Sequence, residues 1–191
     1  MKKQLYVSLT LVLAVFVGIQ SATAQERGNS EPRVSPNASV SQTIGTTVAT
    51  VTYGRPAIKG RTYFEKGAQL APAGSVWRTG ANEATTITFT EDVNFGGEAV
   101  EAGTYLLFTI PGEDSWTIIL NNQLMTDGRP TWGAFTYDES QDEVRVMAAA
   151  VSNDTPMMEW FTVYFDTLSE DMAHLNLHWG STKVAVPVSV K

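Results

Sequence analysis

Two short stretches combine charged, aromatic and amide side chains in a way that suits ligand binding or acid–base catalysis. Residues 54–61 (GRPAIKGR) hold three cations, and residues 76–83 (VWRTGANE) set a tryptophan beside an arginine, an asparagine and a glutamate. Arginine offers a planar fork that fits a carboxylate or a phosphate, and tryptophan can stack on a sugar or an aromatic ring. The candidate ligand-binding residues in these stretches are Arg55, Lys59, Arg61, Trp77, Arg78, Asn82 and Glu83.

Glu83 is the best candidate for a catalytic carboxylate, and Asp138 is a second carboxylate for acid–base work. The alternative is structural. Arg78 and Glu83 would then form a buried ion pair that fixes the loop, and Trp77 would belong to the core. The residue types leave both interpretations open.

Other catalytic and metal-binding patterns find little support. His174 and His178 lie on a predicted strand, where a spacing of four residues separates them by about 13 Å, too far to share one metal ion. The acidic run 138–143 lacks the ligand spacing of an EF-hand loop. The sequence contains no G-x-S-x-G, no P-loop and no G-x-G-x-x-G motif. We therefore predict neither a metal nor a cofactor.

The second stretch runs directly into residues 84–89 (ATTITF), whose β-branched alternation is typical of a buried strand. A loop tied to a core strand is how a rigid scaffold presents a site. About ten such short strands follow one another, separated by turns every eight to twelve residues, and no long helix is predicted. The pattern indicates an all-β fold, a single antiparallel β-sandwich of jelly-roll type. Within it we expect His174, Asn176 and His178 to face outward and Pro187 to mark an edge strand.

The first 24 residues are predicted to be a signal peptide. Lys2 and Lys3 precede an apolar run, and Ala22-Thr23-Ala24 forms a small-x-small cleavage site. A membrane anchor is the alternative, but the run is shorter than the ~20 apolar residues of a spanning helix. We expect a flexible polar leader at 25–37, a single domain at 38–191, and an exported protein, periplasmic or secreted. The absence of cysteine means that the core, not disulfides, must hold this domain together.

Charge narrows the range of partners. Without Lys2 and Lys3, 11 basic residues stand against 20 acidic ones, a net charge of −9. Such a charge disfavours nucleic acid and anionic membranes as partners. We predict no membrane span after signal cleavage, and a glycan or an anionic small molecule as the partner.

Several longer blocks resemble one known family. Residues 52–61, 76–89, 102–121 and 132–146 are similar to the domain of unknown function 2911, which occurs in exported bacterial proteins, and the resemblance covers roughly residues 32–190. It implies an exported, mostly β single domain. The family has no established activity, so no catalytic role can be transferred. Its blocks contain the residues chosen above and add Tyr137 to them, whereas the loop 122–130 is longer than the resemblance implies.

Three hypotheses follow, and the sequence leaves open whether the protein is an enzyme. In the first, the two polar loops converge at one end of a sandwich and bind an anionic or carbohydrate ligand. In the second, the protein hydrolyses a glycan or peptide through Glu83, whose pKa burial would raise. In the third, the polar cluster is internal scaffolding of a structural or protein-interaction module, with no pocket.

Overall fold

The computed structural model describes residues 27–28, 30–152 and 154–190, so the predicted signal peptide lies outside it. This part of the chain forms thirteen strands and two single-turn 3₁₀ helices, and every strand pair is antiparallel. The elements are β1 (Asn37–Ile44), β2 (Thr47–Gly54), β3 (Thr86–Phe89), β4 (Val93–Phe95), β5 (Glu98–Val100), β6 (Gly103–Ile110), β7 (Ser115–Asn121), β8 (Met125–Thr126), β9 (Arg129–Pro130), η1 (Ala134–Thr136), η2 (Glu139–Gln141), β10 (Asp142–Ser152), β11 (Met158–Thr167), β12 (Met172–Gly180) and β13 (Thr182–Ser189). The all-β prediction is confirmed.

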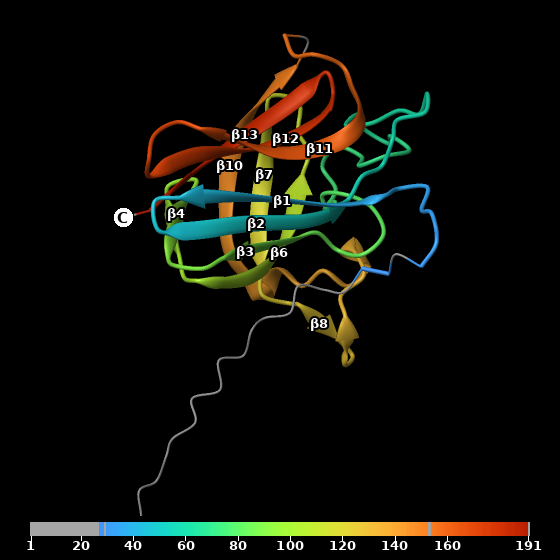
Figure 1. The fold of residues 1–191 in the computed structure, drawn as a ribbon. Coiled ribbons are helices and arrows are strands. Elements are labelled where there is room, and N and C mark those ends of the chain that lie inside the picture. The colour runs from blue at the N-terminus through green and yellow to red at the C-terminus, as the bar shows by residue number, and fades with distance from the viewer. Residues whose placement is uncertain (1–26, 29, 153, 191) are drawn as a thin grey trace, which may run out of the picture.

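The strands follow the order β1-β2-β3-β6-β7-β10-β13-β12-β11, and β4 and β5 extend from β13. The long strand β10 joins two layers, because its first part pairs with β7 and its last three residues pair with β13. Figure 1 shows β11, β12 and β13 in orange and red over the blue and teal strands β1 and β2. Between the layers lies a core in which Trp77, Trp116, Phe161 and Trp179 form an aromatic cluster.

Alternation explains β2 well. Thr47, Ala49, Val51 and Tyr53 are buried, and the residues between them are only partly buried, as expected for a strand with one face on the core. In β12 the prediction of an outward polar face is wrong for Asn176 and His178, which are both buried. Asn176 donates to Asp166 Oδ2 at 2.9 Å, and the His178 ring lies 3.0 Å from the Pro156 carbonyl oxygen. Neighbouring polar groups thus cover this face.

Pro187 does not lie on an edge strand, because β13 is flanked by β12 on one side and by β10 and β4 on the other. Its carbonyl oxygen accepts a hydrogen bond from Gly96 N at 2.8 Å, so its nitrogen also faces the β10 and β4 side. The ladder on that side is interrupted where β13 changes its partner from β10, paired at 182–184, to β4, paired at 188–189. A missing N–H group is tolerated in this interval.

The chain after β2 closes the free edge of β11 at one end of the sandwich. Phe161 N donates to Pro56 O at 2.9 Å, and Ile58 N donates to Glu159 O at 3.0 Å. Arg55 adds a hydrogen bond from Nε to Phe161 O at 3.0 Å. The first polar stretch is thereby held at the end where residues 76–83 also lie. Across the part of the chain that the structure describes, no helix is long and apolar enough to cross a membrane.

Candidate functional site

The two polar stretches meet, as the sequence predicts. Ala81 N donates to Gly54 O at 3.2 Å, and a Cβ atom at position 54 would collide with the Ala81 carbonyl oxygen. Only glycine permits this close approach of the two backbones. The second stretch is also joined to β6, since Trp77 and Thr109 exchange backbone hydrogen bonds of 2.7 and 2.9 Å. Both loops are therefore anchored to the rigid sheet.

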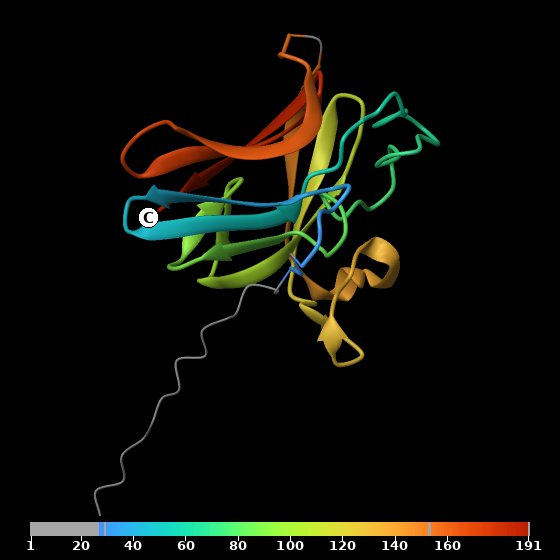
Figure 2. The same ribbon diagram turned by 45° about the vertical axis from the view of Figure 1, so that its right-hand side comes forward.

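Between these loops lies an open cavity of about 440 Å³. We call it the Arg78 cavity. Four predicted residues line it, Arg61, Trp77, Arg78 and Asn82, and Gln69 and Trp132 join them. Figure 2 shows the three segments concerned on the right of the molecule: the teal and green loops after β2, the blue segment before β1 and the golden segment of η1 and η2. Among the residues that the structure describes, the cavity lining contains two guanidinium groups and no carboxylate.

Arg78 is the most constrained of these side chains. Its Nη1 atom donates to Asn82 O at 2.6 Å and to Trp132 O at 3.2 Å. Its Cζ atom lies 5.2 Å from the centroid of the Phe135 ring, within range of a cation–π interaction. Burial lowers the pKa of this guanidinium.

Trp77 serves both as core and as cavity wall. It is only 9% exposed and stacks on Trp179 with ring centroids 5.6 Å apart. Its indole Nε1 donates to Gly80 O at 3.2 Å, so its polar atom is satisfied within its own loop. The two alternatives considered for Trp77 are thus compatible.

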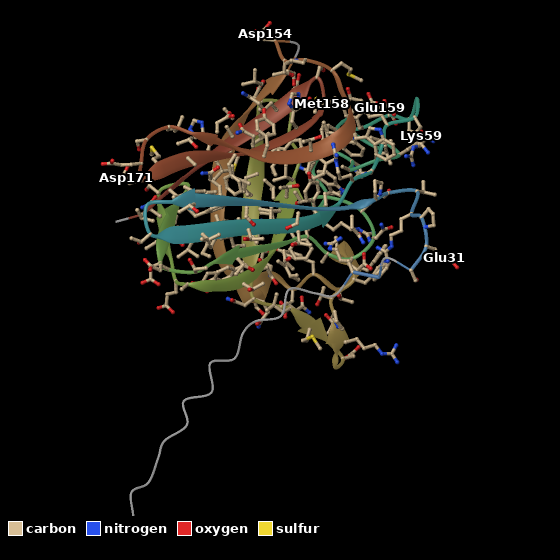
Figure 3. All side chains as sticks on the ribbon, viewed as in Figure 1. Glu31, Lys59, Asp154, Met158, Glu159 and Asp171 are labelled. Carbon is tan, nitrogen blue, oxygen red and sulfur yellow. The ribbon has the colours of Figure 1, made fainter. Side chains whose placement is uncertain are left out.

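The cations of the first stretch are divided among different roles. Arg61 lines the Arg78 cavity while Nε and Nη2 donate to Ile58 O at 3.1 Å and Ala57 O at 2.7 Å. Arg55 turns toward β11, where Nη2 donates to the Thr162 hydroxyl at 2.7 Å. Lys59 is exposed and outside the cavity, and Figure 3 shows it beside Glu159, whose Oε1 accepts from Lys59 N at 2.7 Å. Only Arg61 of the three faces the cavity.

Glu83 belongs to a separate, closed network. Its two carboxylate oxygens accept hydrogen bonds of 2.7 and 2.8 Å from Arg33, and Arg27 Nη1 lies 3.7 Å away. The hydrogen bonds from Arg33 lower the pKa of the Glu83 carboxyl, although burial opposes this. The hydrolase hypothesis requires a raised pKa for Glu83, and this prediction is wrong. The predicted ion-pair partner also differs: it is Arg33, not Arg78.

The segment before β1 is part of the site, which differs from the expected flexible leader. Arg27 is buried and donates through Nη2 to Thr52 O at 3.2 Å and to Ala84 O at 2.5 Å. Burial lowers its pKa to about 10. Ser35 O accepts from Asn82 Nδ2 at 2.9 Å, and Ser35 also lines the Arg78 cavity. The polar, proline-containing composition concealed these contacts, although two arginines in a short leader were a signal of them.

The remaining predicted residues lie elsewhere. Asp138 is exposed and caps η2 by accepting from Ser140 N at 3.0 Å, and it makes no pair with Glu83 among the described contacts. Tyr137 is outside the cavity lining and packs on Phe108, while its hydroxyl donates to Asp142 at 2.6 Å. Burial and Asp142 raise the pKa of Tyr137. Tyr137 thus anchors the segment that carries Trp132.

Sequence reasoning missed the contribution of residues 132–135 (WGAF), which supply a carbonyl oxygen, a side-chain wall and an aromatic ring around Arg78. The signal was two aromatic residues flanking a glycine. Within the described residues, no group of three or more histidine, aspartate or glutamate side chains is arranged to hold a metal ion.

A family model described as "Protein of unknown function (DUF2911)" matches residues 35–188. The chain belongs to this family. No curated protein and no solved structure matches this chain. The match includes Glu83 and the four predicted cavity residues, whereas Arg27 and Arg33 precede it.

Proposed function

We propose that this DUF2911 domain is a non-enzymatic binding module whose Arg78 cavity holds an anionic or carbohydrate ligand. The observation that carries the proposal is the charge of the lining. Of the described residues, two guanidinium groups and no carboxylate line the cavity, and the full chain has 20 acidic and 13 basic residues. A local cationic site on an acidic protein favours an anion.

The surrounding groups suit such a ligand. Trp132 is 53% exposed and lines the cavity, so a flat apolar surface is available for stacking. The amides of Gln69 and Asn82 add neutral hydrogen-bonding groups of the kind that contact hydroxyls. The volume of about 440 Å³ falls in the range of small-molecule sites, ~300–1,000 Å³.

A hydrolase that uses Glu83 is less well supported, because both oxygens of this carboxylate are engaged by Arg33 and Glu83 does not line the cavity. The third hypothesis, a structural or protein-interaction module, remains the alternative that the binding experiment tests.

The experiment is calorimetric titration of a panel of acidic and neutral glycan and cell-wall fragments into the wild type and into Arg78→Ala and Arg61→Ala. We expect both variants to bind at least about tenfold more weakly, the effect of losing one charge-assisted contact. Arg129→Ala is the matched control, because this exposed arginine lies outside the cavity. Unchanged binding in both cavity variants would overturn the proposal. A wild type that binds no fragment would favour the structural module.

We also propose that the protein is exported, to the periplasm or the medium. The support is the n-region, apolar run and cleavage motif in residues 1–24. Fractionation of expressing cells, with N-terminal sequencing, should find a mature chain that begins at Gln25. An uncleaved chain retained in the cytoplasm would contradict this.

A further inference from the structure

Arg78 is held in one orientation before any ligand arrives. Two carbonyl oxygens, those of Asn82 and Trp132, accept from the same nitrogen, Nη1, and Phe135 lies within cation–π range of the guanidinium. Three contacts from two loops prevent the guanidinium from rotating freely. A side chain fixed in this way loses less conformational entropy when it binds.

The opposite side of the same guanidinium is unused. Among the described residues, no hydrogen bond engages Arg78 Nε or Nη2, and the ion pairs involve Arg27, Arg33 and Arg145 but not Arg78. Arg78 is thus a partly buried cation without a carboxylate partner in this part of the chain. Since the Nε and Nη2 atoms of arginine form a fork that matches the two oxygens of one carboxylate, the missing partner can be supplied by a ligand.

Gly133 leaves the space that this arrangement needs. Its φ of 176° is extended backbone that any residue adopts, so its conformation does not require glycine. A Cβ atom there would lie 2.9 Å from both Cζ and Nη1 of Arg78 and 3.1 Å from Nε. These contacts are too short, so any larger residue must displace the guanidinium.

Trp132 precedes Gly133 in the chain and lines the same cavity as Arg78. Its carbonyl oxygen holds Arg78 while its half-exposed indole lines the same cavity. A ring that carries a carboxylate can therefore present its acid to Arg78 and its face to the indole. A sugar ring suits this pair of contacts, because indoles stack on the apolar faces of sugars and the cavity also offers the amides of Gln69 and Asn82.

We infer that the ligand is an acidic saccharide of the uronic acid class, whose carboxylate is bound by Nε and Nη2 of Arg78 and whose ring stacks on Trp132. Gly133 is a positioning residue that keeps Arg78 in place. This inference rests on the proposed function and specifies the ligand class of the same cavity.

The test compares an oligogalacturonate with its methyl ester, which keeps the ring and hydroxyls but loses the charge. The two are titrated into the full protein. We expect the ester to bind at least about tenfold more weakly than the acid. Equal binding of acid and ester would overturn the acidic-saccharide assignment and leave a carbohydrate site standing. Binding of neither to a wild type that binds other panel members would also overturn it, and a wild type that binds nothing would remove the proposed function as well.

Three variants test the residue roles. Arg78→Lys keeps the charge but loses the fork, so it should discriminate acid from ester several-fold less than wild type, whereas Arg129→Lys should change nothing. Trp132→Ala should weaken the binding of acid and ester equally.

Gly133→Ala should weaken binding of the acid at least about tenfold with a melting temperature close to that of wild type. Gly103→Ala is its control, since a Cβ there meets nothing closer than 3.4 Å. Wild-type affinity in Gly133→Ala would overturn the positioning role.

Discussion

Glu83 and Arg78 lie five residues apart in one loop, yet they end in opposite situations. Both oxygens of Glu83 accept hydrogen bonds from Arg33, Arg27 lies close by, and the residue is only 5% exposed. Arg78 is fixed on one side by two backbone carbonyls, and on its other edge no described residue accepts a hydrogen bond. The protein pairs the charge of Glu83 internally, whereas Arg78 is oriented but has no ionic partner within the described ranges.

Residue type therefore does not distinguish a charge that stabilises the fold from a charge that is available for binding. Arg33 approaches Glu83 with Nη1 and Nη2 at 2.7 and 2.8 Å, a two-pronged contact of the kind that we infer between Arg78 and its ligand. The fork of Arg33 is paired within the protein, by a glutamate fifty residues further along the chain. No described side chain does so for the fork of Arg78.

The largest effect should come from opening the closed network. Glu83→Ala leaves buried Arg27 and half-buried Arg33 without their counter-charge, so we expect a loss of about 3–5 kcal/mol in the free energy of unfolding. Urea denaturation measures it, with Glu113→Ala, an exposed turn residue, as the control. A loss below about 1 kcal/mol, the range of surface pairs, would show that the network is not structural.

A smaller loss should follow from weakening the anchor of residues 132–135. Tyr137→Phe removes the 2.6 Å hydrogen bond to Asp142 and should destabilise the protein by about 1–2 kcal/mol. Ligand affinity should fall too, although Tyr137 is outside the cavity, because Trp132 and Gly133 lie in the same segment. Unchanged stability and affinity would show that this segment is held by its other contacts, such as Asn121 Nδ2 to Asp138 O.

Low pH should destabilise the network of Glu83, Arg33 and Arg27 less than the substitution Glu83→Ala does. Because the folded pKa of Glu83 lies below its ordinary value of 4.5, the stabilisation it provides is fully present above that value. It is lost as the pH falls below 4.5 and through the lowered folded pKa. Comparing the unfolding free energies of wild type and Glu83→Gln from pH 7 to pH 3 isolates this contribution. The gap between them should narrow only in acid, and a gap independent of pH would contradict the assignment.

The smallest effect should be that of Lys59, which sequence reasoning grouped with the site. Its side chain is exposed and outside the cavity, so Lys59→Ala should change unfolding free energy by less than about 0.5 kcal/mol and leave ligand affinity unaltered. A clear loss of affinity would mean that the ligand extends beyond the Arg78 cavity.

Local pattern was sufficient for the elements and for part of the site. Alternation in residues 84–89 predicted a strand, and the structure contains β3 there, at Thr86–Phe89. Arg61, Trp77, Arg78 and Asn82 were named from residue type and do line one cavity.

Tertiary contacts determine which charges are paired within the protein and which remain available to a ligand. Arg33 reaches Glu83 and residues 132–135 surround Arg78 across separations of about fifty residues. The periodicity of a sequence does not predict such contacts. A strand pattern predicts which residues lie on the buried face of the sheet, but not which distant side chains will cover the other face. The same principle explains why Asn176 and His178 are buried on a face that alternation marked as exposed.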